Sequence, residues 1–220
     1  MLHQEEYDQY FNQTSPKVLD FVCTLELSII EKQILESIKP AKLLDVGCGS
    51  GNRTFSYYQD NRIDFIGIEK FENYISGSKC PQKILNLCLY SSDFQSQVRA
   101  RLIELNFEQY DAVMLWGQVI NGFNDPDKRE IAWRNLVSLI TKEQYLVIST
   151  LIYPEWYESA AKGRYIKTGM GTPTQYFYSK CELEDIFSSL NLKIDRMFYE
   201  ILEHSNIRHT FFILKSILSN

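Results

Sequence analysis

The distribution of apolar and polar residues divides the chain into short alternating segments. Apolar runs bounded by polar or turn residues predict strands, and apolar residues at every third or fourth position predict helices. Strands are expected at residues 43–46, 63–68, 84–90, 110–115, 144–150, 193–202 and 209–217. Helices are expected at 18–38, in about ten residues after position 51 and at 95–105, 126–140 and 179–190. Strands that alternate with helices are typical of an α/β fold.

The first predicted strand ends in a glycine-rich turn. Asp45 is followed by Gly47, Gly49 and Gly51, which occupy every second position. Glycine lets the backbone turn sharply and lets a ligand approach it closely. The amides of such a turn, with the start of the next helix, favour negative or polar ligand groups. Dinucleotide sites prefer G-x-G-x-x-G, so the spacing argues against a dinucleotide-dependent oxidoreductase. A tight turn between packed elements is the alternative.

Two further features constrain the fold. Glu69 follows the second predicted strand, and the carboxyl ends of neighbouring parallel strands face one crevice, so this acid is expected beside the glycine turn. A position there suits a carboxylate that binds ribose hydroxyls, although an acid at a strand end is often only solvated. The last two predicted strands are separated by six residues, 203–208, and this arrangement predicts an antiparallel hairpin.

The residues from Leu43 to Gly51 match the motif hydrophobic-hydrophobic-D-x-G-x-G-x-G, which resembles motif I of the class I S-adenosylmethionine-dependent methyltransferases. The resemblance implies a Rossmann-like, doubly wound seven-stranded sheet of order 3-2-1-4-5-7-6 with strand 7 antiparallel. It also implies a helical segment at 1–40 that covers the cofactor, and a methyltransferase domain at 41–220 with a lid insertion at about 153–178. The terminal hairpin agrees with this family, because dinucleotide-binding sheets end in a parallel strand.

The resemblance further implies roles for individual residues. Gly47 and Gly49 would lie under the methionine part of S-adenosylmethionine, and Asp45 would orient the loop or bind the amino group. Asp93 and Phe94 would contact the adenine, although Asp93 is equally a helix N-cap, and Asn86 replaces it if the third strand is shorter. The complete set of implied cofactor-binding residues is Tyr10, Asp45, Gly47, Cys48, Gly49, Glu69, Lys70, Asp93, Phe94, Trp116, Gly117 and Gln118.

Candidate catalytic residues follow from topology. The turn of the terminal hairpin is expected at the same edge of the sheet as the glycine turn, which brings His204 and His209 towards Asn121 after the fourth strand. Histidine is the side chain best suited to take a proton near neutral pH. Methyl transfer needs little acid–base machinery, because positioning alone supplies about 7–11 kcal/mol. Polar residues of a hairpin turn are usually only solvated, and that interpretation stays open.

Composition limits the classes of protein. The 220 residues are 45% hydrophobic and 23% charged, as expected for one folded domain, and the net charge of −5 makes nucleic acid an improbable partner. Five scattered cysteines lack the spacing of a disulfide framework or a metal site. No targeting or membrane-spanning segment is recognisable, so a cytoplasmic protein without a membrane partner is expected.

The methyl acceptor is not identified by the sequence. A small molecule or a peptide end is expected, because the predicted core occupies most of the chain. An RNA or protein methyltransferase is the alternative, for which the only hint is a set of basic residues near the lid: Lys162, Arg164, Lys167 and Lys180. A non-catalytic protein that binds S-adenosylmethionine or S-adenosylhomocysteine is a third possibility.

Overall fold

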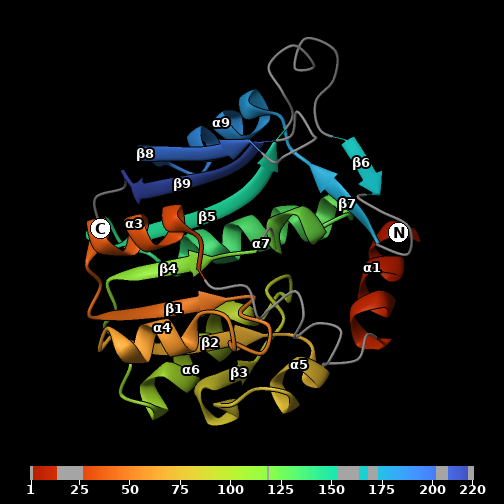
Figure 1. Cartoon of the computed structure of the whole chain (residues 1–220). Helices are drawn as coiled ribbons and strands as arrows, with labels where there is room; N and C mark the ends of the chain where they lie inside the picture. The colour runs from red at the N-terminus through yellow and green to blue at the C-terminus, as the bar shows by residue number, and fades with distance from the viewer. Residues whose placement is uncertain are drawn as a thin grey trace.

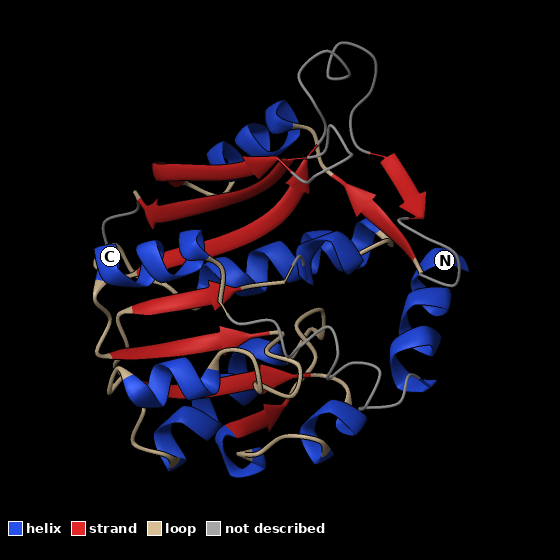
Figure 2. Ribbon diagram, in the orientation of Figure 1, coloured by secondary structure: helices blue, strands red, loops and turns tan. Residues whose placement is uncertain are grey.

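A seven-stranded sheet of order β3-β2-β1-β4-β5-β9-β8 forms the centre of the molecule (Figures 1 and 2). The computed structural model describes residues 2–13, 27–117, 119–152, 164–167, 173–201 and 208–217. The strands of this sheet are β1 (Lys42–Val46), β2 (Asp64–Glu69), β3 (Ile84–Asn86), β4 (Ala112–Leu115), β5 (Tyr145–Ile152), β8 (Leu192–Ile201) and β9 (Arg208–Ser216). Strand β9 is antiparallel to β5 and β8, and the pairs from β3 to β5 are parallel. The strand order and the antiparallel strand predicted from the sequence are confirmed.

Helices cover both faces of the sheet, which gives three layers (Figure 2). The helices and 3-10 turns are α1 (Leu2–Gln13), α3 (Ile29–Ile38), α4 (Phe55–Asp60), α5 (Glu72–Ser76), η1 (Pro81–Lys83), α6 (Phe94–Glu104), η2 (Val119–Gly122), α7 (Pro126–Ser138) and α9 (Lys180–Ser189). Buried residues of α6, α7 and α9 share one core with one side of the strands, and those of α3 and α4 share a second core with the other side. Successive residues of a strand point to opposite faces, so β1 sends Leu44 into the first core and Leu43 into the second.

Several elements differ from the sequence prediction. The third strand ends at Asn86 and not at residue 90, and the helix after the glycine turn is α4, which has six residues. The expected lid at 153–178 contains two strands, β6 (Arg164–Lys167) and β7 (Thr174–Phe177), which pair antiparallel. Residues 153–163 and 168–172 of the expected lid lie outside the described residues, as do residues 18–26 of the predicted first helix.

The carboxyl-terminal edge of the parallel strands carries additional elements. Figure 1 shows α1 and the β6–β7 pair on the side to which the arrows of β1 and β4 point. Helix α1 contacts β7, and from Gln4 to Gln13 none of its residues belongs to either core. None of the described helices is long and apolar enough to cross a membrane.

Candidate functional site

A cavity of about 690 Å³ lies at the carboxyl-terminal edge of β1, β2 and β4. Its wall includes the glycine turn after β1, the residues that follow β2 and β4, and the inner side of α1. A cavity of this size accommodates a ligand of several hundred daltons. Of the residues predicted to bind a cofactor, eight line it: Asp45, Gly47, Cys48, Gly49, Glu69, Lys70, Trp116 and Gly117.

The glycine turn has the backbone conformation that its sequence predicts. Gly47, Gly49 and Gly51 have φ angles of 68°, 59° and 69°, which residues other than glycine rarely adopt. The amide of Gly47 donates to the carbonyl oxygen of Ile68 at 2.7 Å, which fixes the turn against the end of β2. A Cβ atom on Gly47 would lie 2.6 Å from the side chain of Val119. Glycine is therefore required there by both conformation and space.

Glu69 ends β2, and its carboxylate accepts three backbone hydrogen bonds. Oε2 accepts from the amide of Gly49 at 2.9 Å, and Oε1 accepts from the amides of Lys70 at 2.7 Å and Phe71 at 2.9 Å. Burial raises the pKa of this carboxyl, and the three amides oppose that rise. A carboxylate has about four acceptor positions, so about one position on Oε2 remains for a ligand hydroxyl.

Asp45 lies at the floor of the cavity and is 1% exposed. Its Oδ2 accepts from the Thr54 hydroxyl at 2.8 Å and from the Tyr58 hydroxyl at 3.1 Å, and Trp116 Nε1 donates to Tyr58 at 2.9 Å. Oδ1 is buried and has no hydrogen-bond partner among the described residues. Burial raises the pKa of Asp45 to about 7. A cationic ligand group close to this carboxyl would stabilise its ionised form.

Helix α1 is held over the cavity by polar contacts near its start and at its middle. Asp8 forms an ion pair with Lys70 Nζ at 2.6 Å and accepts from the Tyr90 hydroxyl at 2.9 Å, and Lys70 Nζ donates to the same hydroxyl. Gln4 Oε1 accepts from the amide of Asn124 at 2.9 Å. Helix α1 therefore bridges the segments that follow β2, β3 and η2.

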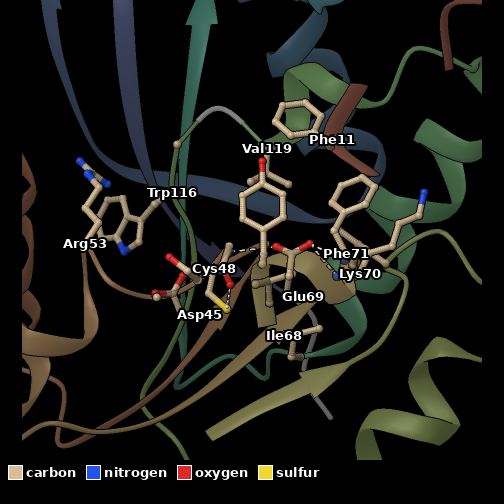
Figure 3. A pocket seen from close by; sticks show the side chains of 18 of the residues that line it. Phe11, Asp45, Cys48, Arg53, Ile68, Glu69, Lys70, Phe71, Trp116 and Val119 are labelled. Carbon is tan, nitrogen blue, oxygen red and sulfur yellow. Dashed lines mark hydrogen bonds between the residues drawn. The ribbon is translucent and has the colours of Figure 1, made fainter. Parts of the chain in front are cut away.

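Aromatic side chains of α1 face the cavity. The ring of Phe11 stacks on Phe71 with a centroid distance of 5.7 Å and an interplanar angle of 27°. Figure 3 shows Phe11, Phe71 and Lys70 at one end of the cavity. Tyr7 also lines the wall, whereas the predicted Tyr10 does not and instead packs edge-on against Phe11. Of the two N-terminal tyrosines predicted to lie over the cofactor, the structure therefore brings Tyr7 to the cavity and not Tyr10.

The opposite end of the cavity is charged. Figure 3 shows Arg53 and Trp116 there, with Asp45 beside them. Arg53 forms an ion pair with Glu31 of α3, whose carboxylate is buried. Glu31 Oε2 also accepts from the amide of Ser28 at 2.7 Å, but Oε1 has no partner among the described residues.

His209 reaches this charged end from the start of β9. The residue pairs with Leu151 near the end of β5 and with Glu200 on β8. Its Nδ1 lies 3.0 Å from Glu200 Oε1, and its Nε2 is buried without a partner in the described part of the chain. Burial lowers the pKa of His209, and the Glu200 carboxylate opposes that change. The imidazole is thus held neutral near neutral pH.

The predicted adenine contacts are not brought to the cavity. Because the strand ends at Asn86, the chain turns away earlier than expected, and Asn86 is exposed. Asp93 is exposed and is held at the surface by hydrogen bonds from Ser91 and Gln97. Phe94 is 0% exposed and belongs to the core beside α6. Of the residues that follow β3, Leu87, Leu89 and Tyr90 line the cavity instead.

Asn121 does not line the cavity, and its hydrogen-bonding groups are used inside the protein. Its Nδ2 donates to the carbonyl oxygen of Tyr176 at 2.7 Å, and its Oδ1 accepts from the amide of Leu151 and the hydroxyl of Thr150, both at 3.1 Å. These contacts join η2 to β5 and β7, so the side chain has a structural role and not the predicted catalytic one. Gln118 and His204 lie outside the described residues.

Four charged residues of the cavity wall were not predicted from the sequence: Asp8, Glu31, Arg53 and Glu200. Glu31 had a local signal, because it completes a capping box with Ser28 at the start of α3. That signal explains the helix start and says nothing about the cavity. The other three depend on contacts between segments that are distant in the sequence.

The structure resembles solved structures of known proteins. An S-adenosylmethionine-dependent methyltransferase from Methanosarcina mazei has a TM-score of 0.63 and 14% identity, over 89% of this chain and 100% of that chain. The 1,6-didemethyltoxoflavin-N1-methyltransferase of Burkholderia thailandensis, solved with its substrate and S-adenosylhomocysteine, has a TM-score of 0.59 and 12% identity, over 84% and 75%. The cyclase SpnF has a TM-score of 0.59 and 10% identity, over 90% and 85%.

The sequence itself matches no protein-family model and no curated protein. Structural likeness at such low identity establishes the fold, because one fold supports different reactions. The strand order with an antiparallel β9 and the glycine turn after β1 agree with that likeness. The chain therefore has the fold of the class I S-adenosylmethionine-dependent methyltransferases.

Proposed function

We propose that the protein is an S-adenosylmethionine-dependent methyltransferase that methylates an oxygen or nitrogen of a small molecule or a peptide end. The observation that carries this proposal is the convergence of the glycine turn, Asp45 and Glu69 on one cavity. Two of the solved structures that share the fold are methyltransferases, and one of them holds S-adenosylhomocysteine.

The polar groups of the cavity fit the methyl donor. The Asp45 carboxyl would attract its ammonium group, and the remaining acceptor position of Glu69 Oε2 would accept from a ribose hydroxyl. The bare backbone at Gly47 and Gly49 allows the methionine part to lie close. Trp116 and Gly117, at the end of β4, would flank the sulfonium. The donor, when bound, supplies a methyl group on a positively charged sulfur.

The end of the cavity beside Phe71 and Lys70 suits the adenine. Phe71, Leu87 and Leu89 supply apolar surface there, in place of the predicted Asp93 and Phe94. Helix α1, with Tyr7 and Phe11 on its inner side, would cover the bound donor, as predicted for the segment 1–40. Such a cover excludes water and holds the reactants in line, and positioning of this kind is worth about 7–11 kcal/mol.

A small acceptor is favoured over RNA or a protein. The net charge is −5, and of the four basic residues predicted as a nucleic-acid stripe only Lys180 has a described side chain, which lies 3.7 Å from Glu184. A cytoplasmic location stays a prediction. Binding of the donor without methyl transfer is the second candidate, because a cyclase shares the fold.

Titration calorimetry tests the binding. We expect heat with S-adenosylmethionine and S-adenosylhomocysteine and none with NAD. Gly49→Val should abolish the heat, because its side chain would occupy the space over the turn. Heat with NAD alone would contradict the proposal. Formation of S-adenosylhomocysteine in the presence of acceptors then separates a methyltransferase from a protein that only binds the donor.

A further inference from the structure

Strand β8 forms one edge of the seven-stranded sheet, and its outer side pairs with no described strand (Figure 1). The opposite edge is β3, which has three residues, whereas β8 has ten. An edge strand presents a row of backbone N–H and C=O groups that can pair with another strand. The edge at β8 is therefore long enough for a further strand to be added to the sheet.

The two halves of β8 differ in the features that prevent such pairing. The first half has a bulge between Ile194 and Arg196, and Lys193 and Asp195 are exposed there. Bulges and charged side chains are common protections of an edge strand. From Arg196 to Ile201 the pairing with β9 is regular, and this part contains neither lysine nor proline. The second half is therefore the unprotected part of the edge.

Apolar side chains of this second half are exposed to solvent. Met197 is 41% exposed and Tyr199 is 52% exposed. Both point to the face of the sheet that α9 covers, because Met197 lies opposite Phe212, which belongs to the core on that side. Phe198, between them, points to the other face and is only half-buried against the second core. Apolar groups exposed along an open edge indicate a surface that binds a partner.

We propose that two copies of this chain pair antiparallel through residues 196–200 of β8, with Phe198 on the two-fold axis, so that their sheets continue into one another. The inference goes beyond the proposed function and does not depend on it. Two-fold dimers are the commonest oligomers of soluble proteins, and each contact in them occurs twice.

Charge selects this register. Residues opposite each other in an antiparallel pair point to the same face. A two-fold axis through Phe198 places Arg196 of each copy opposite Glu200 of the other, and Met197 of each copy opposite Tyr199 of the other. Two opposite-charge pairs then form on the face of α3, and two apolar pairs form on the face of α9. The segment is thus complementary to itself.

The neighbouring registers lose this complementarity. With the axis at Met197, Arg196 faces the apolar Phe198, and with the axis at Tyr199, Glu200 faces Phe198. Neither register forms the two opposite-charge pairs. An axis between two residues is excluded, because it would place side chains of opposite faces against each other.

Both charged side chains are accessible for these contacts. The side chain of Arg196 is 38% exposed, and that of Glu200 is 37% exposed. Within the chain, Arg196 contacts only its neighbour Asp195, through Nε at 3.3 Å, and Glu200 contacts His209 through Oε1 at 3.0 Å. The terminal nitrogens of Arg196 and Oε2 of Glu200 form no hydrogen bond or ion pair with the described residues.

The proposed contact adjoins the cavity. Glu200 lines the cavity wall and contacts His209. Arg196 of the second copy would therefore pair with a carboxylate that also belongs to the site. The interface and the charged end of the cavity would share this one side chain.

Charge reversal in the full chain tests the register. Sedimentation velocity of the wild type should show a dimer. Arg196→Glu converts both opposite-charge pairs into like-charge pairs, and so does Glu200→Arg, so each variant alone should raise the dissociation constant of the dimer at least roughly tenfold. An equal mixture of the two variants restores opposite charges at both pairs and should form a dimer with one copy of each. Lys193→Glu, outside the paired segment, is the control and should sediment as the wild type does.

Cysteine cross-linking tests the same register without reversing a charge. Opposite residues of an antiparallel pair have Cα atoms about 4.5–5.5 Å apart, a distance that a disulfide spans. Met197→Cys and Tyr199→Cys, mixed and oxidised, should form a linked dimer with one copy of each. Each variant alone should link no more than the wild type, which measures the background from the five native cysteines.

Three results would overturn the proposal. The first is a wild type that stays monomeric at the highest concentration reached. The second is a dimer that persists unchanged in both charge-reversal variants, because it would form through another surface. The third is a mixture of the two cysteine variants that links no more than each variant alone, because the strands would then not pair in this register.

Discussion

Glu69 Oε2 lies 2.9 Å from the amide nitrogen of Gly49, so the acid at the end of β2 holds the glycine turn that follows β1. The same carboxylate accepts from the amides of Lys70 and Phe71. Its role is therefore larger than the ribose contact that the sequence suggests. The two strand ends form one unit through this side chain.

Glu69→Gln should weaken binding of S-adenosylmethionine and also lower the melting temperature. The amide nitrogen of glutamine cannot accept, so at least one of the three backbone amides loses its partner, at a cost of about 1–3 kcal/mol. Calorimetry and thermal unfolding measure the two effects. The exposed Glu72→Gln, three residues further along, is the control and should change neither. A full-affinity, fully stable Glu69→Gln protein would show that the amides do not depend on the carboxylate.

Local sequence was sufficient to predict the glycine turn, Glu69 and most of the strands. These features depend on residues that are neighbours in the chain: a strand of buried apolar residues, a positive φ angle, or an acid at a strand end. The strand order required the resemblance as well, because hydrophobic pattern alone does not fix which strands are neighbours. The helix start at Asp125, where the side chain accepts from the amides of Asp127 and Lys128, was likewise predicted from local residues.

The partner of His209 could not be predicted, because it depends on the register of the terminal hairpin. The predicted strands ended at Leu202 and began at His209, which would place these two residues opposite each other. In the structure His209 pairs with Glu200, and Arg208 pairs with Ile201. The number of residues in a long turn does not determine the register, so the Glu200 contact became visible only with the fold.

Phe94 shows a different limit. The sequence pattern gave an aromatic residue after the third strand, and such a residue can face either a ligand or the core. Burial decided the outcome: Phe94 is 0% exposed and lies in the core cluster with Val98 and Leu102 of α6. Phe94, Val98 and Leu102 are spaced four residues apart, so they share the face that α6 buries.

Substitutions of two glycines should separate the effects of conformation and space. Gly47 and Gly117 both have positive φ angles, 68° and 63°, but only at Gly47 would a Cβ atom collide with a neighbour. Gly117→Ala should therefore cost about 1–2 kcal/mol from the backbone alone. Gly47→Ala should cost more, because Val119 must also move. Urea unfolding of the two variants measures the difference, and equal costs would contradict the predicted collision.

Removal of residues 1–15 should impair donor binding more than folding. Helix α1 lines the cavity through Tyr7 and Phe11, but from Gln4 to Gln13 it contributes to neither hydrophobic core. We expect a clear loss of affinity for S-adenosylmethionine in calorimetry with a small change in melting temperature. Asn12→Ala, on the exposed side of α1, is the control. Unchanged affinity in the truncated protein would show that α1 is not a cover for the donor.

The ion pair between Asp8 and Lys70 should contribute little by itself. Both side chains are about a quarter exposed, at 24% and 27%, and pairs of this kind are worth about 0–1 kcal/mol. Asp8→Asn should therefore lower donor affinity by no more than about fivefold, and added salt should reduce even that difference. A loss as large as that of the truncation would mean that this single contact holds the helix closed.

Asp45 makes donor binding dependent on protonation. Burial raises its pKa from about 3.8 to about 7 in the folded protein, so the carboxyl keeps its proton to a much higher pH than a free aspartic acid does. The folded state binds this proton more tightly than the unfolded chain does, so the stabilisation is present at low pH and is lost as the pH rises towards 7.

An ammonium group close to this carboxyl would favour its ionised form, so binding of S-adenosylmethionine should release a fraction of a proton near pH 7. Calorimetry in buffers of different ionisation enthalpy measures that release. Asp45→Asn should abolish it, weaken binding and flatten the dependence of unfolding free energy on pH between about 4 and 7, because asparagine at position 45 does not titrate. Equal proton release by the wild type and the variant would show that the ammonium group binds elsewhere.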